Sequence, residues 1–196
     1  MQKNPHAFPT FSQLPVLFKI KHLQKVTEQQ LIEKCILGER GAQHQLYERY
    51  SKAMYTTAYR ISGNFETAGE VLQDAFLQVF RHIGDFERRS TIGAWIKAIV
   101  VRTALRKLER RKAPFLEMPD QYAEEAIAWG TSALDTDYLE RAIQSLPEGA
   151  RAVFVLAEVE GFAHKEIADL LGISEGTSKS QLHFAKKRLR ETLVPP

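Results

Sequence analysis

Apolar residues recur at three- and four-residue intervals along most of the chain, and this spacing is the strongest constraint on its fold. It places one apolar stripe on each of several helices. The stripe of a helix expected over residues 42–61 consists of Leu46, Tyr50, Met54 and Ile61. No run of alternating apolar and polar residues favours a strand. The sequence therefore predicts an all-α fold.

Capping and stop signals set the expected helix boundaries. Thr27 opens a capping box with Gln30, and Gly38 ends the helix that follows. Two longer helices are expected over residues 66–83 and 92–111. These signals predict a series of helices, with a loop between the last two of them.

Charge and proline positions divide the 196-residue chain further. The net charge is only +3, but no Lys or Arg lies between Ala113 and Glu140. We therefore predict two small helical domains joined by an acidic linker, with basic residues on either side of it. The predicted parts are an N-terminal extension over 1–25, a helical domain over 26–112, the linker over 113–135 and a second helical domain over 136–196. Such charge asymmetry indicates a polyanionic partner.

The stretch from His164 to Leu189 has the pattern of a helix-turn-helix. A short apolar-faced helix would end at Gly172, and Ser174 would cap the next helix. A short helix, a glycine-containing turn and a longer helix define this motif. The C-terminal domain is therefore predicted to be a helix-turn-helix.

The second helix of this motif has an unusual outer face. On a helical wheel, the side facing the domain carries Ser178, Leu182, Ala185 and Leu189. Hydroxyls and amides read base edges, apolar groups meet the thymine methyl, and lysines neutralise phosphate. The predicted DNA-contacting residues are Thr177, Lys179, Ser180, Gln181, His183, Phe184 and Lys187. The alternative is a solvated face, which would rarely carry Phe184.

A second basic surface is expected on the helix over 92–111. Its stripe contains Arg102, Arg106 and Arg110, with Trp95 at one end. A basic face that ends in an aromatic side chain is typical of single-stranded nucleic-acid binding. The preceding loop adds candidates that could hold an unstacked base, namely Arg88, Arg89, Ser90 and Thr91. The alternative is a solvated charged face, which would normally mix the two signs of charge.

The helix over 66–83 carries a candidate protein-binding face. Leu77 is expected to be exposed among Gln73, Asp74 and Gln78, with Glu70 and Arg81 on the same outer face. One apolar anchor with a polar rim suits a protein partner. A lone surface leucine without a partner remains the alternative for this feature.

Catalytic and metal-binding signals are missing from the sequence. Cys35 is the single cysteine, and the six histidines have no ligand spacing. No phosphate loop, nucleophile elbow or zinc-protease motif is present. We therefore expect no enzyme activity, no cofactor and no small-molecule substrate.

Three segments resemble bacterial RNA polymerase sigma factors of the extracytoplasmic-function type. They read "GEVLQDAFLQVFR", "FERRSTIGAWIKAI" and "SLPEGARAVFVLAEVEGFAHKEIADLLGISEGTSKSQL". The first looks like the family's core-polymerase-binding helix, with Glu70, Gln73, Asp74 and Phe76 on the family pattern. We therefore predict that Glu70, Gln73, Asp74 and the exposed Leu77 bind core RNA polymerase. The resemblance implies that the second binds the minus-ten element, and that the C-terminal domain binds the minus-thirty-five element. Gln181 and Phe184 stand where the family often carries Arg.

The resemblance thus implies a sigma factor that binds core RNA polymerase, directs it to promoters and assists melting. It also implies an anti-sigma partner and a cytoplasmic location, with retention at the inner membrane through that partner as an option. The alternative is a helix-turn-helix repressor or activator with a helical sensor domain. A sensor domain would not need the second basic stripe.

Overall fold

A computed structural model of the chain describes residues 27–110 and 136–193. The predicted N-terminal extension and acidic linker lie outside the described residues. Every regular element in the two described ranges is helical, which confirms the all-α prediction. The predicted domain boundaries stay predictions.

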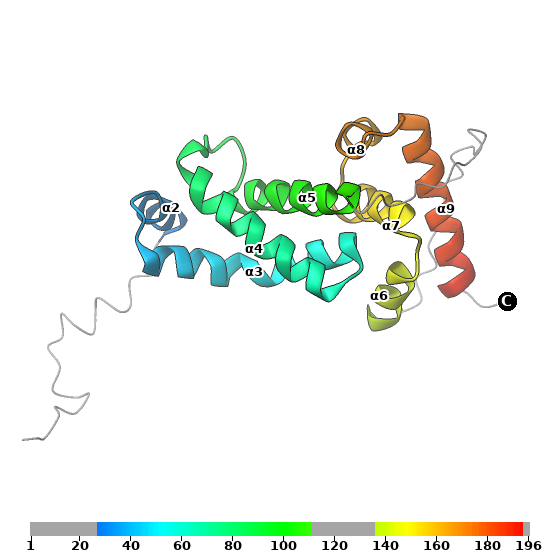
Figure 1. The fold of residues 1–196 in the computed structure, drawn as a ribbon, viewed down its shortest axis with the longest axis horizontal. Coiled ribbons are helices and arrows are strands. Elements are labelled where there is room, and N and C mark those ends of the chain that lie inside the picture. The colour runs from blue at the N-terminus through cyan, green and yellow to red at the C-terminus, as the bar shows by residue number, and fades with distance from the viewer. Residues whose placement is uncertain (1–26, 111–135, 194–196) are drawn as a thin grey trace, which may run out of the picture.

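The described part of the N-terminal half, residues 27–110, contains four α-helices and one short 3-10 turn. They are α2 (Glu28–Ile36), α3 (Arg40–Ser62), α4 (Phe65–His82), η2 (Ile83–Asp85) and α5 (Ile92–Arg110). Helices α3, α4 and α5 pack against one another (Figure 1), and α2 packs on α3. Their apolar stripes form the core, in which Leu46, Ile61, Val71, Ile96 and Val100 are fully buried.

The capping signals act as expected. The Gln30 N–H donates to Thr27 Oγ1 (3.2 Å) and the Thr27 N–H donates to Gln30 Oε1 (3.1 Å), which completes the capping box. Gly63 ends α3 in the left-handed region at φ 67°. Asn64 then caps α4, because its Oδ1 accepts from the Thr67 N–H at 2.9 Å. These two residues make the turn between α3 and α4 short and fixed.

The C-terminal half contains the predicted helix-turn-helix. Its elements are α6 (Thr136–Gln144), α7 (Glu148–Phe154), a π-helical turn (Val155–Val159), α8 (His164–Leu171) and α9 (Glu175–Leu193). Gly172 ends α8 at φ 65°, and Ser174 Oγ accepts from the Thr177 N–H at 2.9 Å. Helices α7 and α8 both pack on α9, so α9 is enclosed on more than one side.

The π-helical turn after α7 was not foreseen from the sequence. The Glu160 N–H donates to the Val155 carbonyl at 3.0 Å, five residues back. Periodicity over so short a segment does not separate a π turn from an α-helix, and such turns often occur at functional positions. This one carries Glu158 and leads directly into Glu160.

The two halves are packed together in the described residues. Helix α7 contacts α3, and α8 contacts α5; Figure 1 shows α7 and α8 beside the end of α5. One continuous cluster of buried apolar side chains runs through both halves. Arg151 of α7 is buried, and its guanidinium lies against the Gly63 turn.

Replacing Gly63 should cost more stability than replacing an open left-handed glycine. A Cβ at Gly63 would meet Arg151 Cζ at 2.6 Å, whereas a Cβ at Gly38 (φ 76°) would meet nothing within 4 Å. Gly38→Ala should therefore lower the free energy of unfolding only by the cost of placing alanine in the left-handed region, about 1–2 kcal/mol. Gly63→Ala should lower the free energy of unfolding by this amount and by a further amount, because the new Cβ clashes with the Arg151 guanidinium. Urea denaturation of both variants measures the difference, and equal losses would mean that Arg151 simply moves aside.

Candidate nucleic-acid and polymerase interfaces

The outer face of α9 presents part of the predicted DNA-contacting set. Lys179 and Lys187 are exposed, while Thr177, His183 and Phe184 are half-buried. Lys179 Nζ lies 3.0 Å from Glu175 Oε1 one turn earlier. An exposed ion pair of this kind contributes little stability, so Lys179 can leave the Glu175 carboxylate and pair with a DNA phosphate instead. The face therefore offers two cations and three shorter side chains.

Two residues of that predicted set are buried, and the prediction for them is wrong in this conformation. Ser180 is 4% exposed and Gln181 is 0% exposed. Ser180 Oγ donates to the Thr177 carbonyl at 3.0 Å. The wheel allowed for one contact side, but α6, α7 and α8 all pack on α9 and widen its buried arc. The predicted inner residues Ser178, Leu182, Ala185 and Leu189 are buried as expected.

Phe184 lies at the wall of a groove beside α9. The groove is lined by Ser145, Pro147, His183, Phe184, Lys187, Arg188 and Glu191. Phe184 also packs against the core, so only part of its ring is accessible. It can contact a ligand with its ring edge while it remains anchored in the domain.

The basic stripe of α5 is exposed as predicted at Arg102, Arg106 and Arg110. Arg106 is oriented from two sides: its Nη2 donates to Gln78 Oε1 (3.2 Å) and its Nε donates to the Arg102 carbonyl (3.3 Å). Gln78 is itself held, because its Nε2 donates to Thr103 Oγ1 at 3.2 Å. The helical pattern placed Gln78 on the outer face of its helix but did not indicate that it orients Arg106.

The loop before α5 is held by short-range contacts. Arg88 adopts φ 58° and its Nη2 lies 3.6 Å from Glu33 of α2, while Arg89 Nε lies 2.6 Å from Glu87 Oε2. All four predicted loop residues, Arg88 to Thr91, are exposed. The loop thus exposes two arginines and two hydroxyl side chains just before the start of α5.

Thr91 and Trp95 have structural contacts as well. Thr91 Oγ1 accepts from the Ala94 N–H at 3.2 Å and caps α5. The ring of Trp95 is half-buried and tilts against Phe86, with centroids 5.5 Å apart. Trp95 is therefore held in place by the core, with part of its ring accessible.

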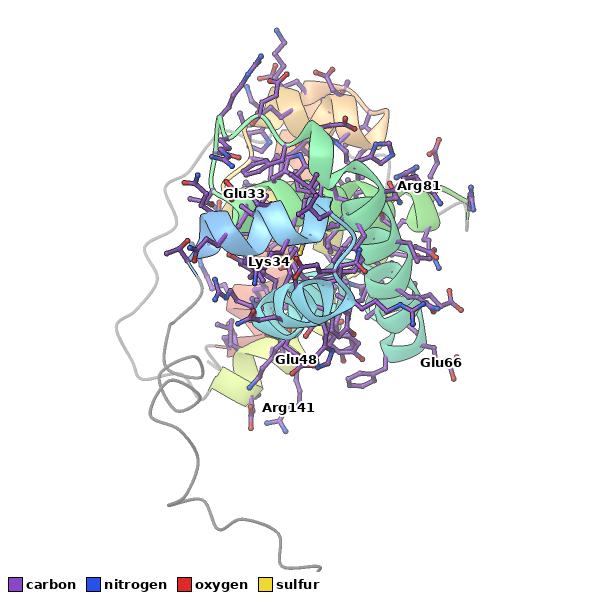
Figure 2. The ribbon with its side chains drawn as sticks, turned by 90° about the vertical axis from the view of Figure 1, so that its left-hand side faces the viewer. Glu33, Lys34, Glu48, Glu66, Arg81 and Arg141 are labelled. Carbon is purple, nitrogen blue, oxygen red and sulfur yellow. The ribbon has the colours of Figure 1, made fainter. Side chains whose placement is uncertain are left out.

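The predicted protein-binding face of α4 is exposed. Leu77 is 58% exposed, and Glu70, Gln73 and Asp74 are exposed around it. Figure 2 shows α4 from one side, with Glu66 and Arg81 near its two ends. A groove between α4 and α5 continues from Leu77 to Arg81, a residue that the helical pattern also placed on the outer face.

This face adjoins the basic stripe through Lys107. Lys107 Nζ lies 2.8 Å from Glu70 Oε2 and 3.2 Å from Asp74 Oδ2. Burial opposes the charge on Lys107, but the hydrogen bonds that it donates to both carboxylates, together with their charges, prevail and raise its pKa. The acidic rim of one surface and the cations of the other therefore share ion pairs.

The described residues include no group of three or more His, Cys, Asp or Glu side chains that could hold a metal ion. Within the same ranges, no helix is long and apolar enough to cross a membrane.

Two family models match the chain in order. "Sigma-70 region 2" matches residues 46–113 and "Sigma-70, region 4" matches residues 136–189. The first range contains α4 and α5 with both predicted surfaces, and the second contains the helix-turn-helix.

Curated relatives cover most of the chain. ECF RNA polymerase sigma factor SigM of Mycobacterium tuberculosis (strain ATCC 25618 / H37Rv) is 32% identical over 169 residues, covering 85% of each chain. RNA polymerase sigma-H factor of Pseudomonas aeruginosa is 28% identical, covering 88% of this chain and 97% of its own. Among solved structures, the sigma factor RpoE of Bartonella quintana, in complex with the anti-sigma factor NepR, has a TM-score of 0.51. It is 24% identical, covers 78% of this chain and 98% of its own, and supports the fold alone.

Removing the Thr91 hydroxyl should destabilise α5 by loss of its cap. Thr91→Ala should lower the free energy of unfolding by about 1 kcal/mol. Thr91→Ser keeps the hydroxyl and should retain most of the stability. Thermal unfolding of the two variants makes the comparison, and equal losses would show that the methyl group, rather than the cap, is what stabilises the start of α5.

Proposed function

This chain belongs to the extracytoplasmic-function family of RNA polymerase sigma factors, and we propose how its surfaces divide the task of initiation. As a sigma factor it directs core RNA polymerase to promoters. A repressor or activator with a sensor domain is not favoured, because the N-terminal half matches the sigma region 2 model. The assignment of single residues below is our proposal.

The observation that carries the proposal is the presence of two separate basic surfaces. One lies on α5 of the region 2 match, and the other lies on α9 of the region 4 match. We assign the α9 surface to the duplex minus-thirty-five element. Thr177, His183 and Phe184 would meet base edges, while Lys179 and Lys187 would neutralise phosphate.

The α5 surface suits the minus-ten element. Arg102 and Arg106 can neutralise the backbone, and the loop from Arg88 to Thr91 can hold an unstacked base. Unstacking costs a few kcal/mol per step, and stacking and phosphate contacts offset that cost. Because the Trp95 ring packs on Phe86, it is already oriented in the free protein and would contact an unstacked base.

We assign the Leu77 face of α4 to core RNA polymerase. The chain would then act as a non-catalytic initiation factor in the cytoplasm, where polymerase and promoter meet. An anti-sigma protein is a further proposed partner, since the Bartonella quintana sigma factor is in complex with one.

Run-off transcription tests the proposed function. Core polymerase with this protein should start at new sites on genomic fragments, and core polymerase alone should not. No new start sites would refute the proposal.

Lys187→Ala should weaken promoter binding by the holoenzyme. It should also reduce, by about 1, the slope of log binding constant against log salt concentration, because one phosphate contact is lost. Lys34→Ala, an exposed lysine of α2 (Figure 2), is the matched control and should change neither quantity.

Substitution on α4 tests the polymerase face. Leu77→Ala and Gln73→Lys should each weaken binding to core polymerase by about five-fold or more, as expected for an interface anchor and its rim. Glu66→Lys lies near the start of the same helix (Figure 2) and serves as the charge-changing control. Fluorescence anisotropy of labelled protein with core polymerase measures the affinity. Unchanged affinity in both Leu77→Ala and Gln73→Lys would remove α4 from the interface.

A further inference from the structure

The groove between α4 and α5 gathers more positive charge than its own carboxylate can neutralise. Its lining contains four cations, Arg81, Arg106, Lys107 and Arg110, and one anion, Asp74. Four positive charges and one negative charge give the lining a formal net charge of +3. Like charges that share a small space repel one another unless a counter-charge joins them. The groove is therefore short of negative charge.

The one acid of the lining is already engaged by the lysine. Asp74 Oδ2 lies 3.2 Å from Lys107 Nζ, and the same ammonium lies 2.8 Å from Glu70 Oε2. Lys107 is thus held by two carboxylates on its α4 side. Within residues 27–110 and 136–193, none of the three arginines of the lining forms an ion pair. The missing negative charge is the charge that these guanidinium groups need.

Arg106 is held in place by a chain of hydrogen bonds that starts at a buried hydroxyl. Thr103 Oγ1 donates to the Ile99 carbonyl at 2.8 Å, so this oxygen can only accept a further hydrogen bond. Gln78 Nε2 donates to it at 3.2 Å, which leaves Gln78 Oε1 to accept from Arg106 Nη2, also at 3.2 Å. The orientation of the amide therefore follows from the hydroxyl, and Arg106 is oriented before any ligand binds.

Arg81 and Arg110 add one guanidinium from each helix. Arg81 lies in the last turn of α4 (Figure 2), Arg110 is the last residue of α5, and both are exposed. Each can turn toward a ligand, because no ion pair with a described residue holds it elsewhere. A guanidinium binds phosphate oxygens through two parallel N–H groups. One oriented and two adaptable guanidinium groups suit a ligand that carries several anionic oxygens.

We propose that this groove is a binding site for a short polyphosphate, supplied either as an inorganic polyphosphate or as the phosphate chain of a nucleotide. Such a chain carries several negative charges and can neutralise the excess in the lining, whereas a single carboxylate cannot. The groove holds about 270 Å³, slightly less than the usual pocket of a drug-sized ligand. It therefore has room for a phosphate chain, and a nucleoside would extend beyond it.

The position of the groove gives such a ligand a regulatory effect, and this part of the inference rests on the proposed function. Arg106 belongs to the surface proposed for the minus-ten element, and Asp74 and Leu77 belong to the face proposed for core polymerase. A bound polyphosphate and the DNA backbone would compete for the Arg106 guanidinium. The ligand should therefore weaken binding of minus-ten single-stranded DNA.

Isothermal titration calorimetry of the full chain with sodium tripolyphosphate tests the site. Arg81→Ala should weaken binding about ten-fold, as expected when a hydrogen bond between charged groups is lost. Arg141→Ala removes the same charge from an exposed position on α6 (Figure 2), outside the groove, and should leave the affinity unchanged. Absence of binding to the wild-type protein would overturn the inference. Equal losses in the two variants would also overturn it, because they would show only a general attraction to positive charge.

A second variant tests the orienting residue without removing a cation. Gln78→Glu keeps the shape of the side chain and places a carboxylate beside Arg106 Nη2, where it would take the place of the ligand. Binding of tripolyphosphate should fall at least about ten-fold. Circular dichroism checks that all variants fold. Wild-type affinity in Gln78→Glu would remove Arg106 from the site and contradict the inference.

The DNA backbone is the other source of phosphate for these cations, and Arg81 separates the two. It lies on α4, outside the residues proposed for the minus-ten element, so Arg81→Ala should leave the affinity for minus-ten single-stranded DNA unchanged. If this variant loses DNA affinity and tripolyphosphate affinity by the same factor, the groove is part of the DNA surface and the inference falls. Titration with ATP in place of tripolyphosphate then identifies the source, since tighter binding of ATP would assign the groove to a nucleotide.

The outcomes for the site and for the proposed function are separate. A protein that binds no tripolyphosphate but supports run-off transcription would lose this inference and keep the proposed function. A protein that binds tripolyphosphate at Arg81 but gives no new start sites would keep the site and lose its proposed effect on promoter binding.

Discussion

The arrangement of the described helices depends on where Arg151 is buried. Its Nη1 donates to the Leu146 carbonyl at 3.0 Å and to the Gln144 carbonyl at 3.3 Å, so it holds the turn between α6 and α7. Burial lowers the pKa of its guanidinium, although Glu148 partly opposes this effect. Its outer edge lies against Gly63, where only a hydrogen fits. One side chain therefore joins a turn of each half.

Ion pairs connect the surfaces that the proposed function assigns to different partners. Lys107 bridges Glu70 and Asp74 on the polymerase side, and Lys97 is paired with Glu160 across the boundary. A phosphate backbone and a carboxylate compete for the same cations, so DNA binding at the proposed α5 surface would be linked to the ion pairs of Lys107 with Glu70 and Asp74.

Local signals were sufficient to place the helices and their ends. Capping at Thr27, the left-handed glycines at Gly63 and Gly172, and the cap at Ser174 depend on neighbours within a few residues. The burial of Ser180 and Gln181 depends on helices distant in the sequence that pack on α9. A helical wheel could not foresee this burial, because it assumes one contact side.

The sequence by itself determined an all-α chain, a helix-turn-helix, two basic faces and the family to which they point, because each is written in short-range spacing and residue type. Only the tertiary structure decided which basic side chains form ion pairs within the protein. Lys97 of α5 and Glu160, just after the π-helical turn, form one such ion pair, with 2.7 Å between Nζ and Oε2. They meet because α3, α5 and the end of α7 pack together, and this pairing across 63 positions of the chain has no local signal. Electrostatic contacts form by proximity in space, and proximity is set by the packed core.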